Sequence, residues 1–208
     1  MLNFIKSLAR KIAYRFYLMG QFEYKRLHEQ APLITIDKTS LLIDGCQINN
    51  NQDNAAKIRV GKMTWIHGHL LLFKHGGEIS IGDYCYVGKD TRIWSAKNIS
   101  IGNRVLISHN VNIIDNITHP INAAERHADF VHIITKGFSE DAKLNEAEII
   151  IEDDVWIGFN ATIMKGVTIG KGAIIGACSL ITKNVPPYAV IVGNPPRIIK
   201  YANASDVS

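Results

Sequence analysis

A regular six-residue spacing of isoleucine is the feature that most restricts the possible folds of this chain. Between residues 151 and 181 every sixth residue is isoleucine, and a small or β-branched residue follows each of them four positions later. A helix repeats about every 3.6 residues and a strand every two, so neither explains six consecutive matches. A short strand and a turn, repeated, explains them. The isoleucines are Ile151, Ile157, Ile163, Ile169, Ile175 and Ile181.

The same spacing occurs upstream, less regularly. Blocks headed "IRVG", "ISIG", "ISIG", "IIIE" and "VTIG" begin 21, 20, 50 and 18 residues apart. Eighteen residues are three hexads, or one turn of a three-sided coil. Hexapeptide repeats indicate a β-helix, in which each coil buries its apolar side chains against its neighbours. Glycines are expected at corners that need unusual backbone angles; they are Gly82, Gly88, Gly102, Gly158, Gly170 and Gly176.

The interval of 50 residues interrupts this spacing. One coil accounts for about 20 of these residues, which leaves an inserted loop at about 115–147. Long loops in compact repeat domains are usually functional or disordered. The stretch from His109 to Glu140 also holds four histidines, and the insertion is therefore the candidate functional segment. The histidines are His109, His119, His127 and His132.

The ends of the chain differ from its centre. Residues 1–28 carry a net charge of +5, whereas the whole chain carries +4. Apolar residues recur there at steps of three and four, which predicts an amphipathic helix with a basic face. Packing on the β-helix or on a neighbouring subunit is the favoured role for this helix, and contact with a membrane surface is the alternative. The predicted organisation is a helical segment at 1–30, a β-helix at 31–200 and a polar tail at 201–208.

Composition excludes several classes of protein. No run of residues approaches the roughly 20 apolar residues of a membrane span, and the N-terminus lacks the pattern of a secretory signal. The three cysteines are widely separated, which favours a reduced, cytoplasmic protein. The chain also lacks the clustered basic face of a nucleic-acid-binding domain.

Residues 155–200, "VWIGFNATIMKGVTIGKGAIIGACSLITKNVPPYAVIVGNPPRIIK", resemble the C-terminal half of the hexapeptide-repeat acyltransferases. This superfamily includes galactoside, maltose and xenobiotic acetyltransferases and the O-acetyltransferases of bacterial surface polysaccharides. The resemblance implies a left-handed parallel β-helix, a homotrimer with active sites between subunits, and acetyl-CoA as donor without a metal. The acceptor would be a hydroxyl group of a carbohydrate. The N-terminal segment differs from that of the simple-sugar enzymes, which favours a surface polysaccharide or its precursor.

His119, in "THPI", matches the catalytic histidine of the superfamily. A hydroxyl is a weak nucleophile near neutral pH, and a positioned imidazole that takes its proton accelerates attack by about 10² to 10⁴. Asp115, Glu125 or a backbone carbonyl would orient His119. Asp115 or Asn116 would otherwise contact the acceptor, although a role in loop turns is favoured for both. The other three histidines are expected to be structural or exposed.

The resemblance also implies a coenzyme site. Trp156 matches a tryptophan beside the reacting thioester, which contributes to catalysis in some relatives; packing on the next coil is the alternative. Gly158 would let the pantetheine arm approach the backbone. The remaining matches lie along the coenzyme channel of relatives, where lysine and arginine meet phosphates; they are Ala177, Thr182, Lys183, Arg197 and Lys200.

Three other functions stay open. An antibiotic (xenobiotic) acetyltransferase would use the same chemistry on a different acceptor. A γ-class carbonic anhydrase shares this type of helix and holds zinc with three histidines; His127 and His132, with His109 or His67, would then be the ligands. A non-catalytic scaffold would keep the fold and bind acetyl-CoA without turnover.

Overall fold

The computed structural model describes residues 33–43, 45–141 and 144–202 of the 208-residue chain. The amphipathic helix predicted in the first 30 residues lies outside the described residues, as does the tail after Ala202. Among the described residues, no helix is both long enough and apolar enough to cross a membrane.

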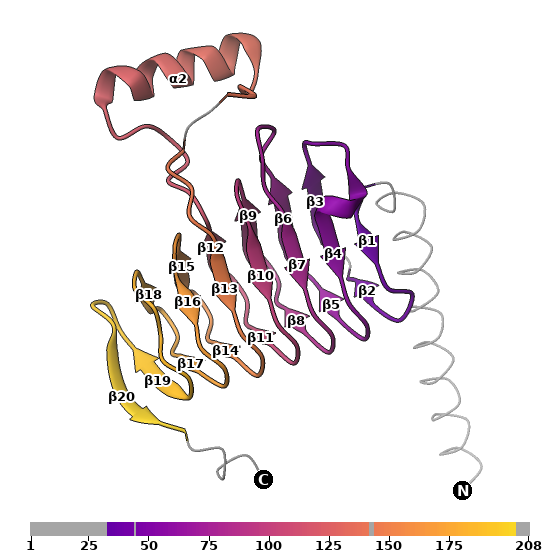
Figure 1. Ribbon diagram of the computed structural model, residues 1–208, viewed down its shortest axis with the longest axis vertical. Coiled ribbons are helices and arrows are strands. Elements are labelled where there is room, and N and C mark those ends of the chain that lie inside the picture. Colours follow the sequence, from indigo (N-terminus) through magenta and orange to yellow (C-terminus); the bar gives the residue numbers. More distant parts are fainter. Residues whose placement is uncertain (1–32, 44, 142–143, 203–208) are drawn as a thin grey trace, which may run out of the picture.

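The strands form three parallel sheets that run along a stack of coils (Figure 1). Sheet A contains β1 (Thr35–Ile36), β4 (Ile58–Val60), β7 (Ile79–Ile81), β10 (Ile99–Ile101), β13 (Ile149–Ile151) and β16 (Thr168–Ile169). Sheet B contains β2 (Leu41–Leu42), β5 (Trp65–Ile66), β8 (Tyr86–Val87), β11 (Leu106–Ile107), β14 (Trp156–Ile157), β17 (Ile174–Ile175), β19 (Ala189–Val192) and the antiparallel β20 (Arg197–Tyr201). Sheet C contains β3 (Gln47–Asn50), β6 (His69–Leu72), β9 (Arg92–Ser95), β12 (Asn112–Ile114), β15 (Thr162–Met164) and β18 (Leu180–Ile181). A short 3₁₀ helix, η3 (Ala55–Lys57), precedes β4.

The isoleucine hexads specify this arrangement. Ile151, Ile157 and Ile163 lie on sheets A, B and C in turn, and all six isoleucines of the run are at most 1% exposed. Each coil thus contributes three inward side chains to one continuous core. The predicted left-handed parallel β-helix is confirmed. One further coil begins before the recognised repeats; its inward residues, also six apart, are Ile36, Leu42 and Ile48.

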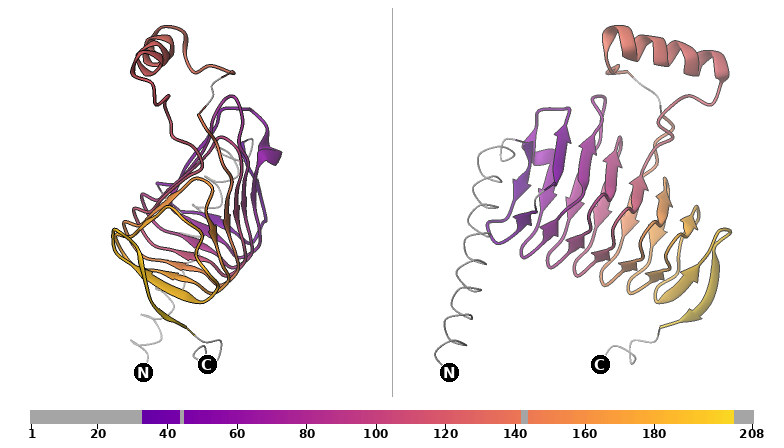
Figure 2. Two further views of the ribbon diagram at one scale, coloured as in Figure 1. Left: turned by 60° about the vertical axis from the view of Figure 1, so that its left-hand side comes forward. Right: turned by 180° about the vertical axis from the view of Figure 1, so that it is seen from behind.

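The strand register shows where the chain leaves the coils. Ile101 pairs with Ile151, and Ile107 pairs with Ile157, although 50 residues separate the members of each pair. The coil that ends with β12 therefore stacks directly on the coil that begins with β13, and the residues between these strands form an excursion. In Figures 1 and 2 this excursion projects from the edge of the stack.

The excursion contains a helix, whereas the sequence interpretation described it as a loop. Helix α2 spans Ala123–Lys136. Its N-cap is Asn122, whose side chain accepts hydrogen bonds from the N–H groups of Ala124 and Glu125, and Gly137 ends it with φ of 87°. Asparagine at the N-cap and a glycine with positive φ after the last turn are the usual signals for the two ends of a helix.

The glycines of the hexads have a different role from the one predicted. Gly102 and Gly158 do not have positive φ; the left-handed angles occur at residues with side chains, such as Arg104 at φ 56°. Instead, a Cβ atom on Gly158 would lie 2.6 Å from the backbone nitrogen of Ala177 in the next coil. The prediction of unusual backbone angles was therefore wrong for these positions, because close stacking of the coils is what requires glycine there.

Candidate active site

His119 lies in the excursion before α2, and its side chain is 46% exposed. Its Nδ1 atom is 3.0 Å from Oδ2 of Asp129, which comes from the second turn of α2. An ionised carboxylate accepts hydrogen bonds and cannot donate them. The contact therefore assigns the proton of a neutral imidazole to Nδ1, which donates to Asp129. Nε2 is left with a lone pair, and this is the atom that can accept a proton from a substrate.

The two arms of the excursion are fastened to each other and to the coils. The N–H of Ile117 donates to the carbonyl of Leu144 at 3.1 Å, across the base of the excursion. Nε2 of His75, in the turn after β6, is 3.1 Å from Oε1 of Glu146 in the returning arm. Beside it, Lys74 forms an ion pair with Glu140. These contacts hold the excursion against the turn that follows β6.

Glu146 is suited to this anchoring role. Partial burial alone raises its pKa, but hydrogen bonds from the N–H of Leu144, from its own N–H and from His75 outweigh burial, so the pKa lies below the ordinary value of 4.5. Because the pKa of Glu146 is lower in the folded protein than in the unfolded chain, its ionised carboxylate stabilises the folded state. This stabilisation is complete above the pKa of the unfolded chain and is lost as pH falls through the lower pKa of the folded protein. The anchor is therefore intact at neutral pH.

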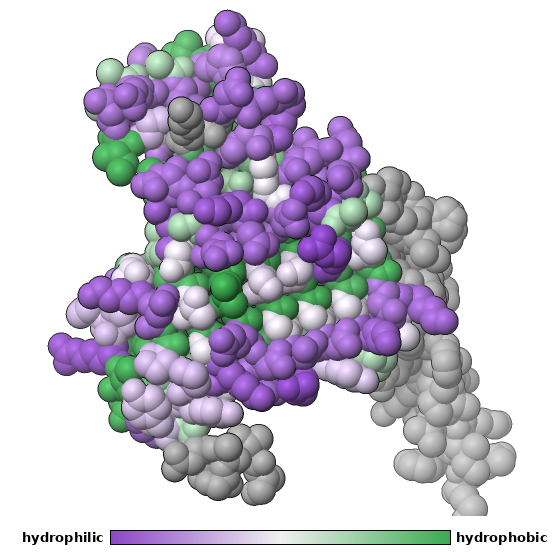
Figure 3. Space-filling model, in the orientation of Figure 1, coloured by the Kyte–Doolittle hydropathy of each residue, from purple (hydrophilic) through white to green (hydrophobic). Residues whose placement is uncertain are grey.

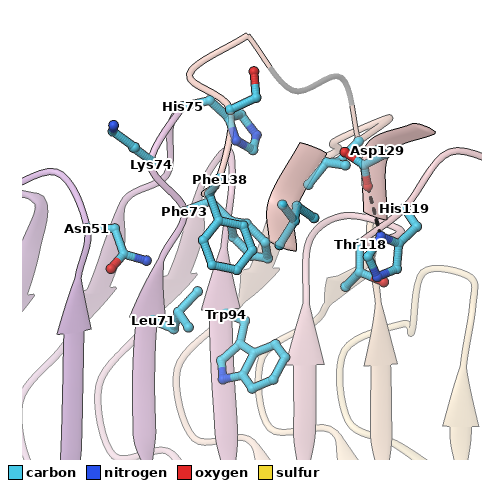
Figure 4. Close-up of a pocket in the computed structure, with 13 residues that line it drawn as sticks. Asn51, Leu71, Phe73, Lys74, His75, Trp94, Thr118, His119, Asp129 and Phe138 are labelled. Carbon is cyan, nitrogen blue, oxygen red and sulfur yellow. Dashed lines mark hydrogen bonds and ion pairs between the residues drawn. The ribbon is translucent and has the colours of Figure 1, made fainter. Parts of the chain in front are cut away.

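A cavity of about 240 Å³ opens beside His119, between the excursion and sheet C. One side is formed by the aromatic rings of Phe73, Trp94 and Phe138, and the other by His119 with Asp129 (Figure 4). It is lined by residues far apart in the sequence, from Asn51 to Leu144. A concave, mainly apolar pocket with a few converging polar groups is the usual form of a small-molecule site.

Asp115 does not orient His119. It is fully buried, and its carboxylate accepts hydrogen bonds from the hydroxyl of Ser95, the side chain of Asn116 and three consecutive backbone N–H groups, those of Ala96, Lys97 and Asn98. Of the three partners suggested for His119, Asp115 is therefore excluded as a contact. Asn116 is also buried and cannot reach an acceptor, so both residues have the structural role favoured by the sequence.

The partner that the structure provides, Asp129, was missed. Glu125, the second candidate, lies in the first turn of α2 next to the N-cap. A signal for Asp129 was present in the sequence, because Asn122 and Gly137 mark the helix ends and Asp129 then falls on a defined face. The backbone carbonyl, the third candidate, has no hydrogen bond to the ring of His119 among the interactions of the described residues.

The other three histidines between His109 and Glu140 do not line the cavity beside His119. The ring of His109 stacks on Phe159 of the next coil, with centroids 5.4 Å apart and planes 4° from parallel. His127 is exposed and His132 half-buried on α2. Among the described residues, no group of three or more histidine, cysteine, aspartate or glutamate side chains is placed to hold a metal ion.

Trp156 lies on the outer face of sheet B and is 51% exposed. It is paired in register with Leu106 on one side and Ile174 on the other. This row continues through Tyr86 and Trp65, so the tryptophan belongs to an apolar row that runs along the stack. Figure 3 shows a band of apolar residues across the coils, edged by polar side chains.

The other predicted coenzyme residues are in the last coils. Thr182 and Lys183 follow β18, and Arg197 and Lys200 lie on β20; all four are exposed, as is Ala177. Gly158 is buried against Ala177, which gives it a packing role independent of any ligand. Neither these residues nor Trp156 line the cavity beside His119. Within one chain, the structure therefore separates the predicted base from the predicted coenzyme site.

Comparison with known proteins supports the fold and the repeat. Residues 148–183 match the family described as bacterial transferase hexapeptide (six repeats). Galactoside O-acetyltransferase of Escherichia coli is 33% identical over 148 residues, which are 71% of this chain and 65% of that protein. A chloramphenicol acetyltransferase of Agrobacterium fabrum is 29% identical over 163 residues, 73% of this chain and 70% of the relative. The chain thus spans slightly less than two thirds of the length of the E. coli enzyme.

Solved structures of hexapeptide-repeat acyltransferases share the fold of this chain. A mutant of AntD, an N-acyltransferase from Bacillus cereus, superposes with a TM-score of 0.66 at 18% identity, over 88% of this chain and 91% of that one. A hexapeptide-repeat acetyltransferase from Vibrio cholerae gives a TM-score of 0.58 at 23% identity, over 87% and 81%. Residues 148–183 thus carry the hexapeptide repeats of the bacterial transferase family, and the chain is similar in sequence and fold to hexapeptide-repeat acyltransferases.

Proposed function

We propose that this protein transfers an acetyl group from acetyl-CoA to a hydroxyl of a carbohydrate acceptor, with His119 as general base. The observation that carries the proposal is the contact between Nδ1 of His119 and Asp129 at the edge of a cavity. This contact leaves Nε2 available to a bound hydroxyl. The contribution expected from such a base is about 10² to 10⁴ in rate.

The proton balance is simple. Nε2 of His119 takes the hydroxyl proton as the oxygen attacks the thioester carbonyl. The C–S bond then breaks, and the imidazolium returns the proton to the departing sulfur of coenzyme A. Asp129 holds the ring in the required orientation and stabilises the transient positive charge, as the carboxylate does in other His–carboxylate pairs.

The residues of the last coils fit a coenzyme with phosphate groups. Lys183, Arg197 and Lys200 are exposed cations, and arginine and lysine are the side chains that bind phosphates. Trp156 offers an exposed aromatic ring for the thioester end of the coenzyme.

We propose that the site is completed between subunits of a homotrimer. Two observations support this arrangement. The residues proposed for the coenzyme do not line the cavity that contains His119, so a neighbouring copy is needed to bring them together. In addition, Phe130 and Ile134 on α2 are 53% and 63% exposed. Apolar side chains gathered on one exposed element commonly mark an interface.

For the acceptor we propose a bacterial surface polysaccharide or its precursor, which the protein would acetylate in the cytoplasm. The support is the similarity to an enzyme named for galactosides. The second candidate is a xenobiotic, because relatives named chloramphenicol acetyltransferase are similar over comparable or shorter stretches.

The test is a transfer screen with the full-length protein. Acetyl-CoA is incubated with galactosides, sialic acid polymers and chloramphenicol, while thiol release is followed and products are weighed by mass spectrometry. We expect thiol release that depends on a carbohydrate and a product heavier by one acetyl group. Transfer to chloramphenicol alone would favour the second candidate. Binding of acetyl-CoA without transfer to any acceptor would contradict the proposal and indicate a scaffold.

A further inference from the structure

The cavity beside His119 is far more apolar than a site for a hydrophilic sugar requires. Its apolar side chains come from two parts of the fold: the outer face and end of sheet C, and the excursion. Phe138 is 59% exposed although it lines the cavity, so this wall faces an opening. The apolar lining residues are Leu71, Phe73, Trp94, Ile133, Phe138 and Leu144.

The orientation of Trp94 is fixed by a chain of hydrogen bonds on sheet C. Its indole nitrogen donates to Nδ1 of His69 at 3.4 Å, and Nε2 of His69 is 2.8 Å from Oδ1 of Asn49. Because an indole N–H only donates, Nδ1 accepts and Nε2 donates to Asn49. Burial, and then the nearby Arg92, lower the pKa of His69, which favours this neutral form. The polar edge of Trp94 is thus occupied on the side away from His119 (Figure 4), and its carbon surface remains for the cavity.

The size of the cavity sets the size of its ligand. A dry cavity of about 150 Å³ lined by apolar side chains is large enough to bind benzene. The cavity here is about 240 Å³, which accommodates a substituted six-membered ring. Thr118, His119 and Asp129 meet on one side of the cavity, beside its apolar surface. The other polar lining residues, Asn51, Lys74, His75 and Ser139, lie elsewhere on its wall.

We infer that the acceptor is an amphipathic alcohol: its reacting hydroxyl meets Nε2 of His119, and an adjacent apolar group about the size of one substituted ring fills the aromatic cavity. This inference rests on the proposed function and adds the class of acceptor. A carbohydrate satisfies it by presenting an apolar ring face or an apolar substituent beside the acetylated hydroxyl. Trp94, Phe73 and Phe138 then determine specificity.

The experiment uses benzyl alcohol, a small molecule that carries a hydroxyl beside a six-membered ring. Its binding to the full-length protein is measured by saturation-transfer NMR, without acetyl-CoA, with ethanol as the hydrophilic comparison. Leu71→Phe fills the cavity from its floor. Met164→Phe is the matched control, because Met164 lies in the same outward row of sheet C, beyond Trp94 and Ile114, and does not line the cavity. Trp94→Ala removes the aromatic wall.

We expect the wild type and Met164→Phe to bind benzyl alcohol at least tenfold more tightly than ethanol, and Leu71→Phe and Trp94→Ala to lose that preference. Equal binding by wild type and Leu71→Phe would overturn the inference. So would absence of binding by the wild type, as expected if a side chain of a neighbouring subunit fills the cavity. Because no donor is present, these outcomes are independent of the transfer screen. Binding with no transfer to any acceptor would contradict only the proposed function.

Discussion

His119→Ala should lower turnover at least a hundredfold while acetyl-CoA affinity stays within about twofold. The variant removes the imidazole whose Nε2 lone pair is left free by the contact of Nδ1 with Asp129 at the edge of the cavity, and general base catalysis contributes about 10² to 10⁴ in rate. Coenzyme affinity should persist because the proposed coenzyme residues are in the last coils. Steady-state kinetics and calorimetric titration with coenzyme A measure the two quantities.

Two further variants separate this role from a general effect on the excursion. His127→Ala removes an exposed histidine of α2 and should leave turnover unchanged. Asp129→Asn keeps the shape of the side chain but removes its charge, so it should lower turnover about tenfold and displace the pH–rate profile, which a purely structural residue would not do. A His119→Ala enzyme with full turnover would remove His119 from the mechanism.

Asp115→Ala should destabilise the β-helix by about 3–5 kcal/mol, because each buried hydrogen-bond donor left without an acceptor costs about 1–3 kcal/mol. The substitution leaves three consecutive backbone N–H groups, from Ala96 to Asn98, without their acceptor. These groups form the turn between β9 and β10, and Asp115 also begins the excursion, so both segments should loosen together. Urea unfolding followed by circular dichroism measures the loss.

The control for Asp115 is an exposed carboxylate. Asp154 pairs with Arg104 on the surface, and its pKa is lowered, first by the hydrogen bond from Arg104. Exposed ion pairs contribute about 0.2–1 kcal/mol, so Asp154→Ala should be several times milder than Asp115→Ala. Equal unfolding curves for the two variants would contradict the structural role of Asp115.

Most of the fold could be predicted because every coil repeats one physical requirement. An inward side chain recurs each time the chain passes from one sheet to the next, and Ile157, Ile163 and Ile169 report this spacing directly. The predicted β-helix at 31–200 includes the first coil, but its hexad was not recognised as a repeat, because Ile36, Leu42 and Ile48 are only three residues in a variable context. The role of Gly158 was predicted wrongly because a side chain there would collide with Ala177 of the next coil. This contact depends on how two coils stack and cannot be recognised from the sequence of one corner.

The candidate site could be predicted only in part. His119 stood out by its place in the interruption and by a resemblance, but Asp129 becomes its neighbour only through helix α2. The cavity was not predictable, since it joins Leu71 and Trp94 of sheet C to an excursion whose docking depends on tertiary contacts such as His75 with Glu146. The local sequence patterns of strands, turns and helices carry no information about these tertiary contacts.

We propose that His119 of one subunit and Trp156 of another serve the same reaction. We would co-express His119→Ala and Trp156→Ala chains with different affinity tags and purify the mixed assemblies by both tags. In a cyclic trimer that contains both variants, one of the three interfaces regains an intact pair. We expect these assemblies to recover about one third of wild-type turnover, while each variant alone stays inactive. Mixed assemblies that form and remain as inactive as the single variants would contradict it.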